Sequence, residues 1–217
     1  MSIMKKLETA LLGLVFIMSV PLTAAAEELD VQNPESQFSL TGGQLTFSAD
    51  PIIFAPKEIN NKDWKGATVT SNILLTDNTG RGDGWTITLA ASDFVSQALT
   101  DPTSGGNGTY TLSYPASNVE VRSGQIYVNT GQQVDTTYGP LSKSFYLSST
   151  PQTIFSADPG YGMGDYQVSP TFWINTPKTV TVSELHGTGS SYAIGDTVGA
   201  VATTYTSMLT YTLASGI

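Results

Sequence analysis

The chain contains one histidine, His186, and no cysteine, which limits the chemistry that its side chains can perform. A serine–histidine–carboxylate hydrolase would have to use His186, which lies in ELHGTG just before a glycine-rich turn, and the chain has no Gly-x-Ser-x-Gly motif. The usual zinc sites need three or four nitrogen, sulfur or oxygen ligands, and one histidine without cysteine cannot build them. We therefore expect no catalytic residue, no metal site and no cofactor, and we interpret His186 as a surface or turn residue.

The carboxylate side chains leave two further kinds of site to consider, a glycosidase active site and a calcium site. Glycoside hydrolysis needs only two of them, so an exported glycan-active enzyme remains an alternative, although most acidic residues here stand beside turn residues as solvated turn formers do. One loop, DNTGRGDG at 77–84, groups Asp77, Asn78 and Asp83, and oxygen ligands on a tight loop suit calcium. An EF-hand loop requires an oxygen ligand at the position of Arg81, and this mismatch disfavours the calcium hypothesis.

The same loop contains Arg81-Gly82-Asp83, the tripeptide that integrin ligands display. Glycines stand at every second position through it, at Gly80, Gly82 and Gly84. Glycine supplies the positive φ that a chain needs to turn sharply into a strand. We interpret the tripeptide as part of a turn.

The residues after this turn alternate between large apolar residues and threonines, and the last residues of the chain repeat the pattern. Residues two apart share one face of a strand. Six residues share the pattern and form our candidate binding set: Trp85, Ile87, Leu89, Leu209, Tyr211 and Leu213. Alternating large apolar residues on a strand are usually buried. We therefore favour a core role for them, with ligand contact as the alternative.

The elements that must position these residues are strands. The chain is rich in Thr, Ser, Gly, Tyr and Val, and it shows no sustained helical periodicity after residue 26. Short alternating runs such as Tyr110 to Tyr114 are divided by Gly, Asn, Asp and Pro. This spacing predicts an all-β fold, a single antiparallel β-sandwich of the Ig-like or Greek-key type with about ten strands. Residues 96–110 are predicted to form a long exposed loop.

The N-terminal residues have the organisation of a secretory signal peptide. Lys5 and Lys6 precede a short apolar run, and TAAAEE supplies a small-x-small cleavage site. We expect a signal peptide at 1–26, a flexible leader at 27–37 and the β-sandwich domain at 38–217. The apolar run is too short for a membrane anchor and no later segment could span a bilayer. Export without cysteine is ordinary for Gram-positive secretion.

The net charge of the chain limits the classes of partner that we expect it to bind. The formal net charge is −9, and removing Lys5, Lys6 and Glu8 with the signal peptide makes it −10. An acidic surface repels nucleic acid, so we expect no DNA or RNA partner. Attachment to an anionic wall would rely on shape and hydrogen bonds, or on bridging cations.

Three segments together resemble the WxL-domain family of Gram-positive surface proteins. They are GWTITLAASDF (84–94), YTSMLTYTLASGI (205–217) and the opening stretch GGQLTFSADPIIF (42–54). In that family a Trp-x-Leu motif lies mid-domain after a turn, and a second one closes the chain within a Leu-Thr-Trp-Thr-Leu-like strand. Ile87 stands here where the family has leucine, and Tyr211 stands where it has the second tryptophan. Both differences keep the physical type of the side chain.

The resemblance implies a non-catalytic domain that is secreted and held on the cell wall. Members of the family associate non-covalently with peptidoglycan, a cell-wall glycan, and bind a membrane-anchored WxL-interacting partner protein. A different reading is a self-assembling surface-layer or filament subunit, because threonine-rich segments such as TYTSMLTYTL could pair edge to edge. The exported glycan-active enzyme is the third reading.

Overall fold

Strands and one short 3-10 turn at Ala116–Asn118 are the regular elements of the computed structural model, which describes residues 38–59 and 64–216. The chain divides into two units, Met1–Ser39 and Leu40–Ile217, and every strand belongs to the second. The predicted signal peptide and leader, residues 1–37, lie outside the described residues. The predicted all-β antiparallel class is confirmed.

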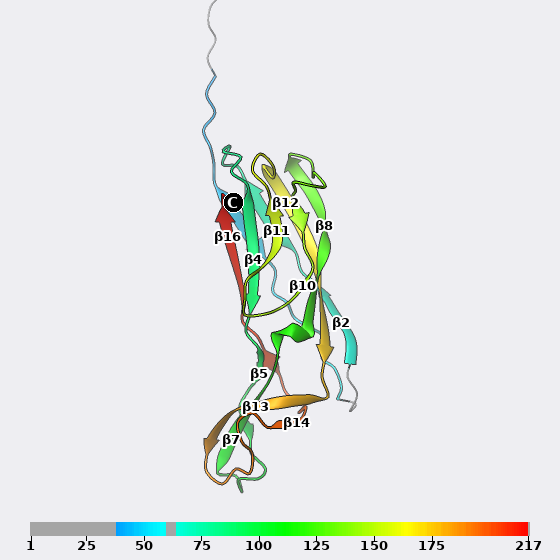
Figure 1. Cartoon of the computed structure of the whole chain (residues 1–217), viewed down its shortest axis with the longest axis vertical. Helices are drawn as coiled ribbons and strands as arrows, with labels where there is room; N and C mark the ends of the chain where they lie inside the picture. Colours follow the sequence, from blue (N-terminus) through cyan, green and yellow to red (C-terminus); the bar gives the residue numbers. More distant parts are fainter. Residues whose placement is uncertain (1–37, 60–63, 217) are drawn as a thin grey trace, which may run out of the picture. The chain divides into compact units, whose positions relative to one another are not determined.

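The strands form three antiparallel sheets, which we call sheets A, B and C (Figure 1). Sheet A contains β1 (Leu45–Ala49), β2 (Trp64–Thr70), β3 (Ile73–Asp77), β8 (Val119–Gly131), β10 (Phe145–Tyr146) and β12 (Gly164–Thr176). Sheet B has the order β16 (Leu209–Ser215), β4 (Trp85–Ala91), β11 (Gln152–Ala157) and β9 (Leu141–Ser142). Sheet C contains β5 (Phe94–Ser96), β6 (Leu99–Thr100), β7 (Gly108–Tyr114), β13 (Thr179–Gly187), β14 (Thr197–Gly199) and β15 (Tyr205–Thr206).

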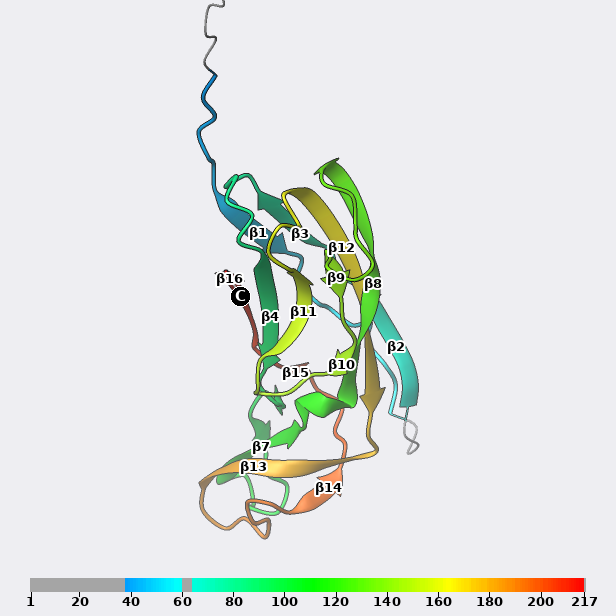
Figure 2. The ribbon, with the colours of Figure 1, turned by 45° about the horizontal axis from the view of Figure 1, so that its top comes forward.

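Sheets A and B are the two layers of a β-sandwich. Figure 2 shows β16, β4 and β11 in one layer, and β1, β3, β12 and β8 in the other. Between them lie the largest fully buried side chains, among them Trp85 and Phe155 from sheet B and Tyr166 and Phe172 from sheet A. Trp85 contacts residues of both layers: the centroid of its ring lies 4.8 Å from that of Phe155 in sheet B and 6.4 Å from that of Tyr166 in sheet A. The core is therefore built by the inward faces of alternating strands.

Sheet C continues from sheet B, because β5 follows β4 in the chain after two residues. Its β7 confirms the predicted alternation: Tyr110, Leu112 and Tyr114 are all buried. Thr111, on the opposite face, is buried as well, and its hydroxyl lies 2.8 Å from the hydroxyl of Ser183 on β13. Both faces of this strand are thus covered, which the simple alternation does not reveal.

The expected number of about ten strands is too low, since the described residues contain sixteen. Several of the additional strands are pairings of only two or three residues, and one of these lies in a segment that we predicted to be a loop. Residues 96–110 are that segment: they contain β6, and Asp101 within them is fully buried. The Asp101 carboxylate accepts hydrogen bonds from the backbone N–H and the hydroxyl of Thr103, at 2.8 and 2.7 Å. The prediction of an exposed loop is therefore wrong at its centre: the Asp101 N–H donates to the Gly108 carbonyl at 2.9 Å and folds the chain back onto β7, while the second carboxylate oxygen, Oδ2, is enclosed without a partner within the described residues.

Candidate functional site

The structure brings the two aromatic–aliphatic motifs together on neighbouring strands. Strand β16 pairs antiparallel with β4, and Tyr211 stands opposite Leu89 while Leu213 stands opposite Ile87. These side chains therefore share one face of sheet B, the face that points to the core. Trp85, Ile87 and Leu89 have no exposed surface. The first motif is consequently part of the core, as we favoured from its alternation.

The second motif lies at the margin of the sandwich. Strand β16 ends the order of sheet B, and Leu209, Tyr211 and Leu213 are half-buried on it. The Tyr211 hydroxyl is enclosed and has no hydrogen-bond partner within the described residues. Burial raises the pKa of Tyr211 to about 12. The phenol is therefore neutral over the physiological range and is not suited to act as a base.

Trp85 also makes one polar contact, which connects the core to a surface loop. Its indole N–H donates a 2.9 Å hydrogen bond to the carbonyl oxygen of Gly162, in the loop between β11 and β12. Gly162 has φ +78°, and a Cβ there would meet the Cβ of Ala157 and lie 2.7 Å from the indole nitrogen. Only glycine allows the backbone this close an approach to the ring. The first motif thus fixes the position of a loop as well as filling the core.

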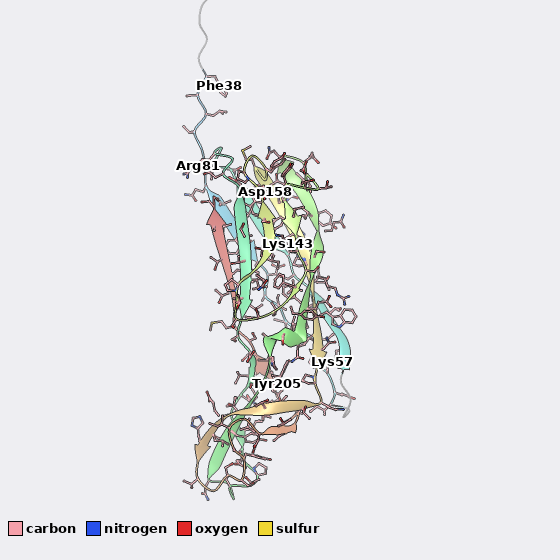
Figure 3. All side chains as sticks on the ribbon, in the orientation of Figure 1. Phe38, Lys57, Arg81, Lys143, Asp158 and Tyr205 are labelled. Atoms are coloured by element: carbon pink, nitrogen blue, oxygen red, sulfur yellow. The ribbon has the colours of Figure 1, made fainter. Side chains whose placement is uncertain are left out.

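Three loops meet where this contact is made, and we call residues 78–84, 132–139 and 158–163 the loop platform. Arg81 and Asp158 mark this end of the sandwich in Figure 3. The Gly160 N–H donates to the Gly82 carbonyl at 2.8 Å. Gln132 crosslinks the remaining loops: its side chain donates to the Gly160 carbonyl at 3.1 Å and accepts from the Met163 N–H at 3.0 Å. The platform is therefore held by hydrogen bonds between its loops and by the Trp85 indole beneath it.

Two tyrosines of the platform stack on each other at the surface. The rings of Tyr138 and Tyr161 lie 4.9 Å apart with an interplanar angle of 22°. The Asp158 N–H donates to the Tyr138 carbonyl at 2.8 Å, and the Tyr161 N–H donates to the Asp158 carbonyl at 3.0 Å. Tyr138 is 46% exposed and Tyr161 is half-buried. The pair offers an aromatic surface with two phenol groups to a ligand.

The sequence alone did not predict this pair of tyrosines. Each tyrosine stands among turn residues, in TTYGP and in DPGYGMG, where no strand period assigns it to the core. An aromatic residue inside a glycine- and proline-rich turn is a usable signal, because a loop lies at the surface and displays its side chains. What the local signal cannot give is the pairing, since the two tyrosines come from different loops.

The Arg81-Gly82-Asp83 triplet lies in the platform as a turn. Gly80, Gly82 and Gly84 have φ of +69°, +66° and +73°, which confirms the prediction that the alternating glycines serve the turn. Arg81 and Asp83 are both exposed. They line a polar hollow of about 300 Å³ next to the start of β1.

The acidic residues of this loop also act as turn formers. Asp77 is buried, and its carboxylate accepts hydrogen bonds from the N–H and the hydroxyl of Thr79 at 3.0 and 2.7 Å. Within residues 38–59 and 64–216, no three His, Cys, Asp or Glu side chains gather as a metal site requires. His186 lies on β13 with its side chain 66% exposed, 3.5 Å from the equally exposed Glu184.

Comparison of the chain with protein-family models, curated proteins and solved structures finds no match. The part of the chain that the structure describes contains no helix long and apolar enough to cross a membrane.

Asp135 and Asp165 are two of the carboxylates whose hydrogen bonds contribute stability that depends on pH. The N–H groups of Tyr138 and Thr137 donate to Asp135 at 2.9 and 2.7 Å and lower its pKa. Hydrogen bonds from Thr76 and Thr130 lower the pKa of Asp165. A carboxylate with a lowered pKa stabilises the fold above its unfolded pKa of about 3.9, and this contribution is lost as the pH falls through the lower folded value.

We therefore expect these two carboxylates to contribute their full stabilisation between pH 7 and 5, and the free energy of unfolding to lose that contribution below about pH 4. Urea unfolding at several pH values measures it. Asp135→Asn removes one titrating group, so this variant should lose less stability on acidification than the parent protein does. An identical acid-induced loss in both proteins would contradict the role given to Asp135.

Proposed function

We propose that this chain is a non-catalytic, exported cell-surface protein whose WxL-like domain binds the Gram-positive cell wall without a covalent bond. The observation that supports this most is the pairing of β4 with β16, which sets Trp85-x-Ile87 and Leu209-x-Tyr211-x-Leu213 side by side in one sheet. Two similar motifs distant in sequence thus form one structural unit, as expected if both belong to a single WxL-like domain.

The buried motif residues do not themselves offer a binding surface, so we place the contact with the wall on the loop platform. Trp85 supports this surface from below through its bond to Gly162. Tyr138 and Tyr161 supply the contact area. Tyrosine combines a rigid apolar ring with a polar hydroxyl, which suits both the faces of sugar rings and protein interfaces. Trp85 is therefore a positioning residue, and the two tyrosines are the contact residues.

Charge has a minor part in this binding. The chain carries a net charge of −9, and Asp83 and Asp158 are exposed on the platform beside Arg81. An acidic surface is repelled by anionic wall polymers, and salt screens that repulsion. Binding through stacked rings and hydrogen bonds should therefore be retained or slightly strengthened as the salt concentration rises.

The test is retention of the purified protein on peptidoglycan, with and without teichoic acid, at several salt concentrations. Tyr138→Ala combined with Tyr161→Ala should weaken retention at least about tenfold, the effect of losing about 1.4 kcal/mol of binding free energy. Tyr146→Ala is the matched control, because Tyr146 lies on β10 and is 58% exposed. Equal retention of all three proteins, with unchanged melting temperatures, would refute the assignment of the contact to the platform.

A membrane-anchored partner protein, which the resemblance to the WxL family implies, is the other ligand that we propose for the same surface. One outcome is that the double tyrosine variant keeps its binding to peptidoglycan and loses its binding to a membrane-anchored protein encoded next to this chain. In that case the platform is the binding surface for the partner protein. Cross-linking on intact cells, followed by identification of the attached chain, distinguishes the two ligands.

One observation favours the self-assembling subunit as a second candidate function. Strand β16 ends sheet B, and its seven residues, LTYTLAS, include no charged side chain and no proline. Natural edge strands usually carry such residues to prevent pairing with other chains. A particle size that grows with protein concentration in size-exclusion chromatography would support this candidate, and a sharp monomer peak at high concentration would exclude it.

A further inference from the structure

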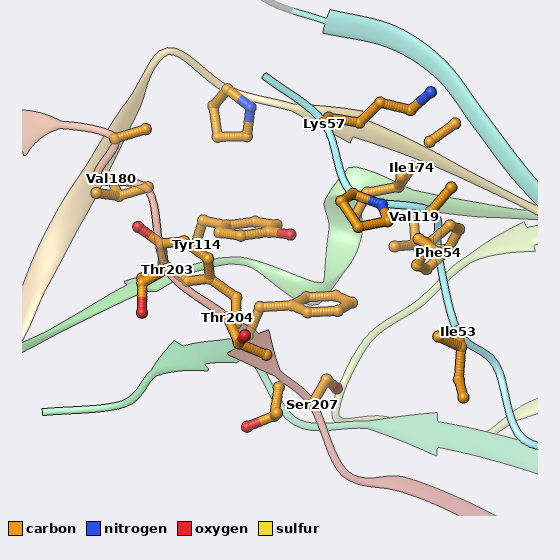
Figure 4. A pocket seen from close by; sticks show the side chains of 18 of the residues that line it. Ile53, Phe54, Lys57, Tyr114, Val119, Ile174, Val180, Thr203, Thr204 and Ser207 are labelled. Carbon is orange, nitrogen blue, oxygen red and sulfur yellow. The ribbon is translucent and has the colours of Figure 1, made fainter. Parts of the chain in front are cut away.

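A hollow of about 590 Å³ opens into the core at the junction of sheets A and C, away from the loop platform (Figure 4). Its floor consists of buried side chains from several strands and from the segments between them: Phe94, Tyr114, Val119, Phe172, Ile174 and Val180. Its rim consists of residues 52–59 and 200–207. On the rim, Ile53 is 76% exposed and Ile59 is 47% exposed.

The hollow is partly open to solvent, but its floor of buried side chains borders more unfilled space than a packed core usually leaves. Cores are packed like organic crystals, and voids larger than a water molecule are few. A space of 590 Å³ corresponds to roughly twenty water molecules, at about 30 Å³ each. Water in it would have few polar partners on the floor, and the apolar side chains there lack the contacts that a filled core provides. Small-molecule sites have about this volume and this mainly apolar lining.

The polar groups of the hollow lie on its rim. Lys57 and Lys178 line it, and Glu58 is the one acidic residue among the described residues that do. Two of the seven basic residues of 27–217 thus lie here, although that part of the chain has seventeen acidic residues. Figure 4 shows Lys57 on one side of the hollow and Thr203 on another, with the Tyr114 ring between them.

Thr203 provides an independent indication of a ligand. Its hydroxyl oxygen is enclosed and has no hydrogen-bond partner within the described residues. A buried hydroxyl without a partner is costly, and native structures rarely leave one unsatisfied. Thr203 lines the hollow, so a polar atom of a bound molecule could supply the missing partner.

We propose that this hollow binds an anionic amphiphile, with its aliphatic chain against the apolar floor and its carboxylate or phosphate group at Lys57 and Lys178. The site is separate from the tyrosine pair, so this inference stands or falls independently of the wall-binding function. Fatty acids and phospholipids share this chemistry, and the nature of the preferred head group distinguishes them. Binding of such a molecule would give an acidic protein a specific contact with lipid at the cell surface.

The experiment is a titration of the full mature protein with dodecanoate, dodecyl phosphate and the uncharged dodecanol, all below the concentrations at which they aggregate. Isothermal calorimetry should give saturable binding of one molecule per chain, with at least one of the anions about tenfold or more tighter than dodecanol. Because a ligand that binds only the folded state stabilises it, the melting temperature should rise with ligand concentration. A tighter carboxylate indicates a fatty acid, and a tighter phosphate indicates a phospholipid.

Two kinds of variant test the assigned residues. Lys57→Gln combined with Lys178→Gln should reduce the affinity of the anions to that of dodecanol and leave dodecanol binding unchanged. Lys143→Gln is the matched control, because Lys143 is exposed and does not line the hollow. Ala200→Phe places a ring in the rim and should abolish binding of all three probes.

Three results would overturn the proposal. They are the absence of saturable binding, dodecanol binding as tightly as both anions, and binding that survives Ala200→Phe in a folded protein. If Ala200→Phe does not fold, the lysine pair decides the question: anion affinity that is the same in Lys57→Gln combined with Lys178→Gln as in Lys143→Gln also overturns the proposal.

Discussion

Replacing Trp85 by alanine is expected to lower the free energy of unfolding by about 3–5 kcal/mol, the usual loss for truncating a large aromatic residue in a core. Trp85 has no exposed surface and contacts Phe155 in its own sheet and Tyr166 across the sandwich, so the neighbouring strands cannot close over the space it leaves. Urea unfolding followed by circular dichroism measures the loss. An unchanged unfolding free energy would contradict the core role and favour direct contact with a ligand.

Trp85→Phe is the matched control for this prediction, since it keeps most of the apolar volume and removes the indole N–H. The hydrogen bond to Gly162 is then lost, at a cost of about 1–3 kcal/mol because a buried carbonyl is left without its partner. The platform loop should exchange its amide hydrogens faster in this variant, at residues 158–163 in particular. Peptidoglycan retention should fall together with this loss of loop order, although Trp85 touches no ligand in our proposal.

Replacing Gly84 by alanine is expected to destabilise the fold by at least about 3 kcal/mol, within the range that backbone strain and overpacking reach together. Gly84 has φ +73°, and a Cβ there would lie 2.6 Å from the Ala157 carbonyl oxygen and 2.8 Å from backbone atoms of Asp158 and Pro159. These atoms belong to the main chain at the end of β11, so they cannot move aside as a flexible side chain would. Thermal unfolding measures the effect.

Gly80→Ala separates the two causes of this loss. Gly80 has φ +69°, nearly the same as Gly84, but a Cβ at Gly80 would have no atom within 4 Å. This variant should therefore show only the strain of a positive φ, about 1–2 kcal/mol. Equal losses in the two variants would mean that the close approach of the loop to β11 is not what excludes a side chain at Gly84.

The local pattern of the sequence was sufficient to predict the strands that carry the motifs. The alternation from Trp85 to Leu89 and from Leu209 to Leu213 gives the inward faces of β4 and β16, because the side-chain period of a strand is two. The glycines of the 77–84 loop likewise predicted the turn, since the positive φ they permit is a property of the single residue. Features that depend on neighbouring residues along the chain could therefore be predicted from the sequence.

Features that depend on contacts between distant segments could not be predicted from the sequence. Nothing local shows that β12 pairs with three other strands, β2, β3 and β8, so the division into three sheets could not be derived. The Tyr138–Tyr161 stack and the hollow at Lys57 also arise from loops that meet only in the folded chain. Burial of Asp101 was missed for a different reason: its carboxylate bonds locally to Thr103, two residues away, and the same local pattern is also typical of an exposed turn.

The arrangement of sheet B has a consequence for how fast the protein folds. Strand β4 is central in that sheet, and both its partners are remote in sequence: β11 begins about sixty positions after β4 ends, and β16 more than a hundred. The chain loses the entropy of closing these long loops before the hydrogen bonds and side-chain contacts of either strand pair can form. All-β chains dominated by such pairings fold in milliseconds to seconds. Until then the apolar inward face of β4 has no lasting cover. The newly synthesised chain therefore passes through an interval in which this face is exposed, and the length of that interval affects how much of the chain escapes aggregation.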